Sequence, residues 1–345
     1  MYFRASLTRG VGLCQLMTVK KTRCLLLRLS SFGDVVLASA ALAALPSDTH
    51  EVVWVIASRF QGLLQAHPSG VRVIPFDSRD GFFGWYQLCR TLWNERFDIV
   101  FDLHGSLRTR ILRILFRLWS LKDRRSYTLK LLPKQRLREL CVLVFKGLVP
   151  KRCWPTPWVE RYALGIAHAR PDFTFYRLNQ AERLVALMPS SRWPQKAWST
   201  ASYVECIRLL PCPVIVLGTK EDRASHVLCQ ALDQASIPYI HGITQSVPEL
   251  IAMLSRTALY VGSDTGIAHL AEAMGIPVFV LFGPTHPMLG FGPWRTESQS
   301  LGSPLGCRPC SKSGRICFRF WDKRACLKRL EPKEVAARVI HHLAQ

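Results

Sequence analysis

The chain has 345 residues, of which 49% are hydrophobic and 20% are charged, and its formal net charge is +22 at pH 7. This composition excludes a disordered chain, and the length suits two domains that each bury a core of their own. No apolar run reaches the roughly 20 residues that a membrane-spanning helix needs, so we expect a soluble protein.

The N-terminal half opens with a strand, a turn and a helix. Residues 24–29 form an apolar run typical of a buried parallel strand. The turn that follows carries Gly33 beside Asp34, and an apolar helix is expected over 35–45. A helix cap is one role for this acidic residue, because Asp is common at that position. Further strands are predicted at 52–56, 71–76 and 99–103.

Positive charge is most concentrated after the fourth of these strands. Residues 104–152 contain fourteen lysines and arginines but only two acidic residues. Arg110, Arg113 and Arg117 recur at helical spacing among leucines and isoleucines, which predicts a basic amphipathic helix. Such a helix suits an anionic membrane surface or a phosphorylated acceptor, and a solvated basic face is the simpler alternative. Because stacking aromatics do not alternate with these charges, nucleic acid is not expected as a partner.

A second series of alternating elements follows a boundary that we place near residue 180. Strands are predicted at 213–217, 237–240, 258–261 and 278–282. Helices are expected up to residue 232, over 247–254, up to Gly275 and over 331–344. The sequence therefore predicts an α/β fold, whose ligands should bind beyond the carboxyl ends of parallel strands.

The turn between the last two strands is the most informative segment. Asp264, Thr265 and Gly266 stand where a helix begins. A helix N-terminus offers unpaired N–H groups and partial positive charge, and a glycine lets the backbone come close, so a diphosphate is a natural ligand. A helix cap that serves the structure alone is the alternative. Neither this turn nor the one at Gly33 matches a dinucleotide-binding or Walker motif.

The twelve cysteines fit a reducing compartment if most of them lie in the core. Cys307, Cys310, Cys317 and Cys326 are the exception, because thiolates at such spacing can converge on zinc or on an iron–sulfur cluster. The second pair is not a C-x-x-C pair, so unmetallated structural thiols and a disulfide remain alternatives. We expect a structural or redox role for these four residues.

Four motifs stand in a characteristic order along the chain. They are LSSFGDVV at 29–36, DLHGSLR at 102–108, WPQKAW at 193–198 and GSDTGIAH at 262–269. In this order they resemble glycosyltransferase family 9, the bacterial lipopolysaccharide heptosyltransferases and their relatives. The resemblance implies the GT-B architecture, in which two Rossmann-like domains face each other across a cleft.

The same resemblance suggests how the chain is divided. The expected units are an N-terminal extension over 1–21, an acceptor-binding domain over 22–180, a nucleotide-sugar-binding domain over 181–330, and a C-terminal helix over 331–345 that can pack back on the first domain. Because family members start a few residues before their first strand, Met17 is an alternative initiator. A signal peptide is not expected, since the extension lacks a clear hydrophobic core and cleavage site.

The resemblance also implies roles for residues at matching positions. Asp34 matches the catalytic base, which takes the proton of the attacking acceptor hydroxyl. Lys196 matches a lysine that stabilises the departing diphosphate. The full set on the donor side is Ser191, Lys196, Glu221, Asp264, Thr265, Gly266 and His269. On the acceptor side the set is Gly33, His104 and Arg108.

Two departures from the family pattern concern the donor. Arg192 replaces a small residue, and Ser199 replaces the proline that usually follows Trp198. These changes leave the transferase class intact, but they leave the identity of the nucleotide sugar open.

The resemblance therefore implies an inverting, metal-independent glycosyltransferase that needs no cofactor. It would transfer a heptose from ADP-heptose to the lipopolysaccharide inner core, with a phosphorylated lipid A–core as acceptor. We expect a cytoplasmic protein at the inner face of the cytoplasmic membrane, in peripheral contact with anionic lipid. A related transferase with another nucleotide sugar or acceptor is the nearer alternative. A non-catalytic basic protein that binds RNA or membrane, or a zinc-stabilised interaction module, is the more distant one.

Overall fold

The computed structural model describes residues 20–65, 67–166 and 182–345. Most of the predicted extension, including Met17, lies outside these residues, and so does the predicted boundary near residue 180. No helix in the described part of the chain is long and apolar enough to span a bilayer.

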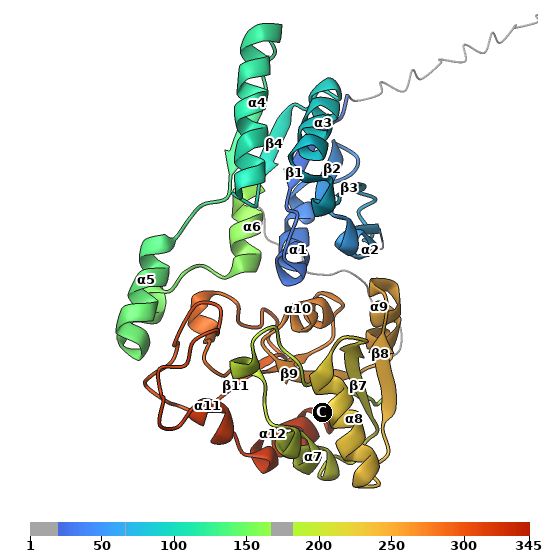
Figure 1. Ribbon diagram of the computed structural model, residues 1–345, viewed down its shortest axis with the longest axis vertical. Coiled ribbons are helices and arrows are strands. Elements are labelled where there is room, and N and C mark those ends of the chain that lie inside the picture. The colour runs from blue at the N-terminus through green and yellow to red at the C-terminus, as the bar shows by residue number, and fades with distance from the viewer. Residues whose placement is uncertain (1–19, 66, 167–181) are drawn as a thin grey trace, which may run out of the picture.

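The N-terminal domain is built on a parallel sheet with the strand order β3-β2-β1-β4-β5 (Figure 1). Its strands are β1 Thr22–Leu27, β2 His50–Ala57, β3 Arg72–Phe76, β4 Ile99–Asp102 and β5 Thr128–Leu131. Its helices are α1 Phe32–Ser39, α2 Gln61–Gln65, α3 Gly81–Asn94, α4 Leu107–Asp123, α5 Arg136–Phe145 and α6 Trp158–Ile166. The middle of β1 is fully buried because it lies in the centre of the sheet and is covered on both faces.

Helices cover both faces of this sheet. Leu26 and alternate residues of the neighbouring strands pack with α1, α2 and α6, whereas Leu25 and Leu27 pack on the opposite face with α3 and α4. The alternation follows from the strand period of two, which sends successive side chains to opposite faces.

The C-terminal domain is built on a second parallel sheet, with the strand order β11-β10-β9-β6-β7-β8. Its strands are β6 Val185–Met188, β7 Val214–Thr219, β8 Ile240–Thr244, β9 Leu259–Ser263, β10 Val278–Leu281 and β11 Gln299–Leu301. Its helices are α7 Thr200–Arg208, α8 Arg223–Gln234, α9 Val247–Ser255, α10 Gly266–Ala273, α11 Ala325–Lys328 and α12 Pro332–Leu343. The predicted α/β class is thus confirmed, with two parallel sheets.

The two domains meet through helices that follow their central strands. Helix α1 of the first domain lies directly against α10 of the second (Figure 1). Buried side chains from both domains, among them Val35 and Ala268, belong to one continuous apolar cluster. The interface therefore brings the carboxyl-terminal edges of the two sheets close to each other.

Five elements differ from the predicted ones in position or were not predicted. Helix α1 starts at Phe32 instead of residue 35, because Ser31 caps it and Asp34 lies inside its first turn. Strand β8 starts at Ile240, since Pro238 has no N–H group to donate to the neighbouring strand. The short strands β5, β6 and β11 are not among the predicted strands, because runs of three or four residues show no clear periodicity.

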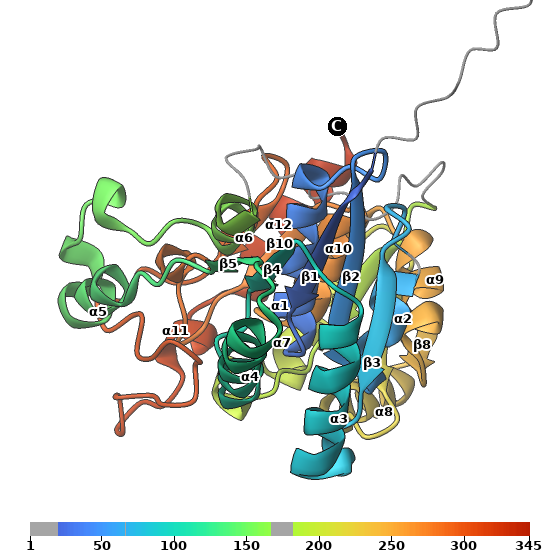
Figure 2. The same cartoon turned by 90° about the horizontal axis from the view of Figure 1, so that it is seen from above.

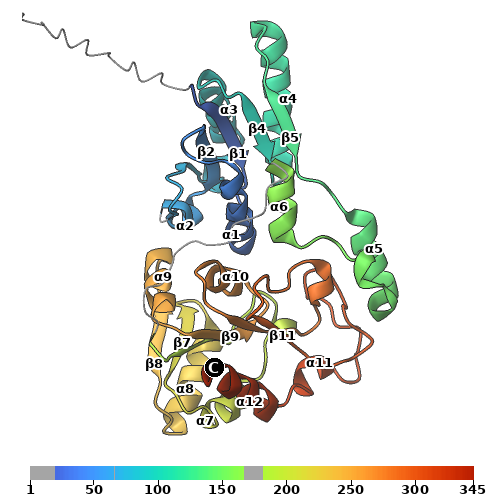
Figure 3. The ribbon, with the colours of Figure 1, turned by 180° about the vertical axis from the view of Figure 1, so that it is seen from behind.

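The sequence predicts a C-terminal helix that can pack back on the N-terminal domain, but among the described residues this helix packs within its own domain. Helix α12 packs against α7 (Figure 3). Val335, Ala336 and Val339 complete the apolar cluster on the outer face of the C-terminal sheet. This arrangement buries the apolar stripe of α12 within its own domain.

Helix α4 lies beside α3 on one face of the first sheet, whereas α5 extends away from the body of the N-terminal domain (Figure 2). The predicted basic helix is confirmed as α4, which buries Leu112 and Phe116 but leaves Ile114 and Leu118 exposed. Helix α5 packs through Val142 on Met288 of the C-terminal domain. The first domain thus reaches across to the second at a place remote from the α1–α10 contact.

Candidate active site

Asp34 lies in the first turn of α1, where its carboxylate is held from several sides. Oδ2 accepts hydrogen bonds from the backbone N–H of Ser31 at 3.2 Å and from its hydroxyl at 2.7 Å. The same oxygen is 2.6 Å from Nη2 of Arg28, which comes from the end of the first strand segment. Oδ1 accepts a weaker hydrogen bond, at 3.3 Å, from the hydroxyl of Tyr162 on α6. Oδ1 is therefore the oxygen with more room for a further partner.

These contacts determine the charge of Asp34. Burial alone would raise the pKa of the carboxyl group, but the Arg28 guanidinium and the hydrogen bonds from Ser31 outweigh it and hold the pKa below its usual value. Arg28 is itself buried, and its Nη1 donates to the carbonyl of Leu103 at 2.9 Å. The carboxylate is therefore ionised at neutral pH and fixed in orientation.

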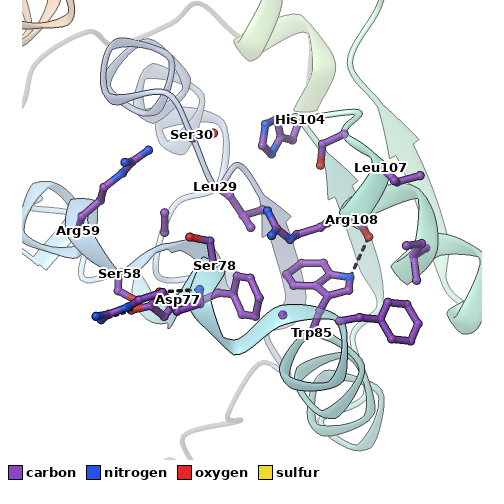
Figure 4. Close-up of a pocket in the computed structure, with 17 residues that line it drawn as sticks. Leu29, Ser30, Ser58, Arg59, Asp77, Ser78, Trp85, His104, Leu107 and Arg108 are labelled. Atoms are coloured by element: carbon purple, nitrogen blue, oxygen red, sulfur yellow. Dashed lines mark hydrogen bonds and ion pairs between the residues drawn. The ribbon is translucent and has the colours of Figure 1, made fainter.

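His104 and Arg108 follow β4, the neighbour of β1, and so lie at the same edge of the sheet as Asp34. Both line a cavity of about 830 Å³ in the N-terminal domain, with Asp77 and Ser78 on its other side (Figure 4). Burial, helped by the nearby Arg28, lowers the pKa of His104 to about 4. Its Nδ1 is buried and has no hydrogen-bond partner among the described residues. The 830 Å³ cavity is thus lined by a neutral imidazole that has a nitrogen without a hydrogen-bond partner among the described residues.

On the other side of the interface, Lys196 and Asp264 form a partly buried ion pair. Nζ of Lys196 is 2.8 Å from Oδ2 of Asp264, and the Thr285 hydroxyl donates to the same oxygen at 2.9 Å. Lys196 ends a 3₁₀ turn, Pro194–Lys196, which is tied to β9 because the Ser263 hydroxyl donates to the carbonyl of Lys196. The ammonium group is therefore positioned beside the turn that starts α10.

Two glycines let the first turns of α1 and α10 touch. A Cβ atom on Gly266 would lie 2.7 Å from the backbone N of Gly33, and one on Gly33 would lie 2.9 Å from Cα of Gly266. Such distances are far inside ordinary van der Waals contact, so any larger residue would push the helices apart. The N-terminal turn that carries Asp34 thus lies against the one that follows Thr265.

Most of the predicted residues line one cavity of about 260 Å³ between the domains. Its wall from the first domain includes Gly33 and Asp34. Its wall from the second domain includes the predicted donor residues Ser191, Lys196, Asp264, Thr265, Gly266 and His269. The hydroxyl oxygen of Ser191 is buried there without a hydrogen-bond partner among the described residues, so it is available to a ligand.

His269 lies between the two helices and is almost fully buried. Burial lowers its pKa, although Asp264 and Asp34 oppose the shift. A Cβ atom on Gly33 would come within 3.2 Å of Cδ2 of the His269 ring. The imidazole is therefore neutral and packs against the turn that carries Asp34.

Glu221 does not line this cavity. It is exposed in the turn after β7, whereas Ser191 follows β6 and Asp264 follows β9. Because β9, β6 and β7 are neighbours in the sheet, these three residues lie in a row along one edge. An extended ligand bound at Asp264 can reach Glu221 by following that edge.

A third cavity, of about 730 Å³, is strongly basic, and Arg28, the partner of Asp34, is one of the residues that line it. Its basic lining residues are Arg28, Arg110, Arg113, Lys134, Arg136, Arg161 and Lys312. Asp102 pairs with Arg113 at 3.0 Å, and Glu139 pairs with both Arg161 and Lys312. Since the cationic groups outnumber these two carboxylates, the cavity suits a ligand with several negative charges.

The four C-terminal cysteines are free thiols in the structure. Cys310 and Cys326 are buried, and burial raises the pKa of Cys326 to about 11. Sγ of Cys310 donates to the carbonyl of Cys307 at 3.4 Å. Among the described residues, no group of three or more His, Cys, Asp or Glu side chains is arranged to hold a metal ion. A metal at these cysteines remains a prediction.

Several residues around the cavity are not among the predicted ones. Arg28 had a signal in the sequence, because it is the single charge in an otherwise apolar strand segment. Tyr162 had none, since it is 128 residues away from Asp34 along the chain. Lys312 lines both the 260 Å³ and the 730 Å³ cavity. It had no signal in the sequence, because the only motif in its segment is formed by the cysteines.

Comparison with protein families gives one clear match. Residues 158–317 match glycosyltransferase family 9, described as heptosyltransferases. Lipopolysaccharide heptosyltransferase 1 of Pseudomonas aeruginosa is 26% identical to this chain, over 92% of this chain and 97% of the relative. The match therefore extends well beyond the part covered by the family profile.

Solved structures resemble the whole fold. A family 9 glycosyltransferase from Veillonella parvula superposes with a TM-score of 0.71 at 17% identity, covering 95% of this chain and 99% of that one. The heptosyltransferase WaaC of E. coli, solved with ADP, gives a TM-score of 0.66 at 18% identity and covers 93% of this chain and 100% of that one. These likenesses confirm the predicted GT-B architecture.

Proposed function

Because the chain belongs to glycosyltransferase family 9, we propose that it transfers a heptose from ADP-heptose to the lipopolysaccharide inner core. One observation carries this proposal. The carboxylate of Asp34 and the Lys196–Asp264 pair line the same cavity, each beside the first turn of a helix. A base and a leaving-group clamp are the two parts that an inverting transfer needs.

The donor would bind on the side of the C-terminal domain. The N-terminus of α10 and the ammonium group of Lys196 would meet the diphosphate, which gains negative charge as the sugar departs. The buried hydroxyl of Ser191 would donate to a phosphate oxygen. The nucleoside would then lie along the sheet edge toward Glu221. Support for an adenine nucleotide comes from the related E. coli enzyme, which was solved with ADP.

Asp34 would act as the base from the side of the N-terminal domain. Oδ2 is occupied by Arg28 and Ser31, so the proton of the acceptor hydroxyl would pass to Oδ1. The lowered pKa keeps Asp34 ionised, so that it can accept the proton, although it also makes the carboxylate a weaker base. Since the hydroxyl attacks opposite the leaving diphosphate, the configuration at the transferred carbon would be inverted.

The acceptor would occupy the N-terminal domain. The basic 730 Å³ cavity offers several guanidinium groups, which bind phosphate or carboxylate groups in a bidentate manner. The neighbouring cavity with His104 and Arg108 would hold the remaining sugars. A phosphorylated lipid A–core carries charge of the right sign for this arrangement.

The position of the acceptor in the cell suggests where the protein works. We place it in the cytoplasm, at the inner face of the cytoplasmic membrane, in peripheral contact with anionic lipid. Arg110 and Arg117 of helix α4 are exposed and add to the positive charge of the protein surface, which favours anionic lipid. Arg113 is less available, since it pairs with Asp102. No role for nucleic acid is proposed.

A second candidate is a family 9 transferase that uses another nucleotide sugar. The observation that favours it is Arg192, which replaces a small residue of the family pattern and lines the donor cavity. Its guanidinium group could select a different sugar or nucleotide by charge and size. Both candidates share the fold and the proposed roles of Asp34 and Lys196.

A thermal-shift comparison of ADP, GDP and UDP, with and without chelator, separates these candidates. Selective stabilisation by ADP and ADP-heptose, unchanged by chelator, is the expected result, because a ligand that binds only the folded state raises its melting temperature. Stabilisation by UDP or GDP sugars would favour the second candidate. No response to any nucleotide would reject both.

A further inference from the structure

One side of the molecule exposes apolar side chains from both domains. Leu137, Phe145 and Leu148 come from α5 and the turn after it, and Phe318, Phe320 and Trp321 come from the segment before α11. Leu148 is 86% exposed, and both Phe320 and Trp321 are 74% exposed. We call these six residues the arm surface.

Contacts between the two segments bring the two parts of the arm surface next to each other. Nζ of Lys146 donates to the carbonyl of Cys307 at 3.1 Å and lies 5.6 Å from the ring centroid of Phe318. Lys312 pairs with Glu139 of α5 at 2.7 Å. Helix α5 and the segment before α11 lie on the same side of the molecule in Figures 1 and 3. Helix α5 and the segment before α11 are therefore exposed on the same side of the molecule.

The packing of α5 explains why its second face is free. Val142 and the neighbouring Leu143 pack with Met288 and Leu289 of the C-terminal domain. The side of α5 that carries Leu137 and Phe145 points away from this cluster and is exposed. Helix α5 is therefore apolar on two faces, and only one of them is buried by packing within the protein. An exposed apolar face of this kind is typical of an interaction surface.

The charge around the arm surface is strongly positive. Residues 136–152 contain five lysines and arginines, and their one acidic residue, Glu139, is buried and paired with Arg161 and Lys312. Residues 315–324 contain four basic residues, and their one acidic residue, Asp322, pairs with Lys328 at 2.9 Å. Exposed aromatic and aliphatic groups surrounded by unopposed cations fit the interface of an anionic bilayer.

We propose that the arm surface docks the protein on an anionic lipid bilayer. Apolar side chains would enter the headgroup region, and the surrounding lysines and arginines would bind lipid phosphates. The first residue of α5, Arg136, also lines the basic 730 Å³ cavity, so docking here brings that cavity close to the lipid surface. This last step rests on the proposed function, because it takes the acceptor to be lipid-anchored.

The test is co-sedimentation of the purified full chain with vesicles. Wild type should bind vesicles that contain phosphatidylglycerol, more weakly as salt is raised, and should bind pure phosphatidylcholine poorly. The double variant Phe320→Ser/Trp321→Ser and the single variant Leu148→Ser should both bind less, with a partition coefficient about tenfold lower or more for the double variant. Phe83→Ser is the matched control, since Phe83 is 70% exposed but lies on α3.

Three results would overturn the proposal. The first is wild-type binding by the double variant, and the second is equal loss in the Phe83→Ser control. The third is a concentration-dependent dimer that the arm-surface variants abolish, because the partner would then be a second copy of the chain. Stabilisation by ADP and transfer to a deacylated, water-soluble acceptor test the proposed function separately, and the arm-surface variants should leave both unchanged.

Discussion

Substitution of Gly266 by alanine tests whether the close contact of α1 and α10 sets the geometry of the site. A Cβ atom there would lie 2.7 Å from both the backbone N of Gly33 and Cδ1 of Phe32. Ordinary contact begins near 3.4 Å, so the helices would have to separate by roughly 0.7 Å or more. Overpacking of this kind costs about 1–3 kcal/mol. A displacement near 1 Å between reacting groups lowers the rate by about 100-fold.

The variant should affect the transfer rate much more than the stability of the fold. Alanine is a better helix former than glycine by up to about 1 kcal/mol, which offsets only part of the clash, so the melting temperature of Gly266→Ala should fall by a few degrees. Its kcat/KM for transfer should fall about 10- to 100-fold, because Asp34 and the donor turn move apart. Steady-state kinetics at several donor concentrations, with a thermal melt of the same sample, measure both quantities.

The control is Gly306→Ala, since a Cβ atom at Gly306 would meet nothing within 4 Å. This variant should have wild-type kinetics and stability. Activity of Gly266→Ala within twofold of wild type would refute the reasoning, because the contact would then be too loose to position Asp34. A large loss of stability without a change in kcat/KM would refute it as well.

The other predictions concern the charged groups of the site. Asp34→Asn should keep ADP binding in a thermal-shift assay but lose about 10²- to 10⁴-fold in kcat, and a near-wild-type rate would remove Asp34 from the role of base. The pKa of Asp34 is lower in the folded than in the unfolded protein, so ionised Asp34 stabilises the fold above about pH 4. The loss of stability caused by Asp34→Asn, measured by urea unfolding, should therefore become smaller below that pH. Burial lowers the pKa of His104 to about 4, so wild type should lose stability as the pH falls from about 6.5 to 4, and melts of His104→Asn should show less of this loss. Lys196→Ala should weaken ADP binding about tenfold or more in calorimetry and leave Asp264 without its cation, and unchanged affinity would contradict contact with the diphosphate.

The strands and helices that carry the site were predictable because their signals are local. The apolar run before Gly33 and the small-residue turn at Asp264 each mark the end of a buried strand, and the structure has a strand and a helix at both places. The α/β class followed from the alternation of such runs. The roles given to single residues came from the family resemblance, and they remain proposals until a variant tests them.

The surroundings of Asp34 could not be predicted, because they depend on packing over long distances. Tyr162 reaches Asp34 only because α6 packs against α1. Lys312 meets Glu139 across 173 residues of the chain. Helix α12 stays on its own domain because its apolar stripe completes the core there. No periodicity or motif in the sequence states which elements become neighbours in such cases.

The most direct measurement is the transfer reaction itself. Purified protein, ADP-heptose and a heptose-free lipid A–core acceptor are incubated with chelator, and the products are followed by mass spectrometry. The proposed function predicts one added heptose on the acceptor and release of ADP, with both lost in Asp34→Asn. Release of ADP without an extended acceptor, or transfer from UDP or GDP sugars in place of ADP-heptose, would contradict it.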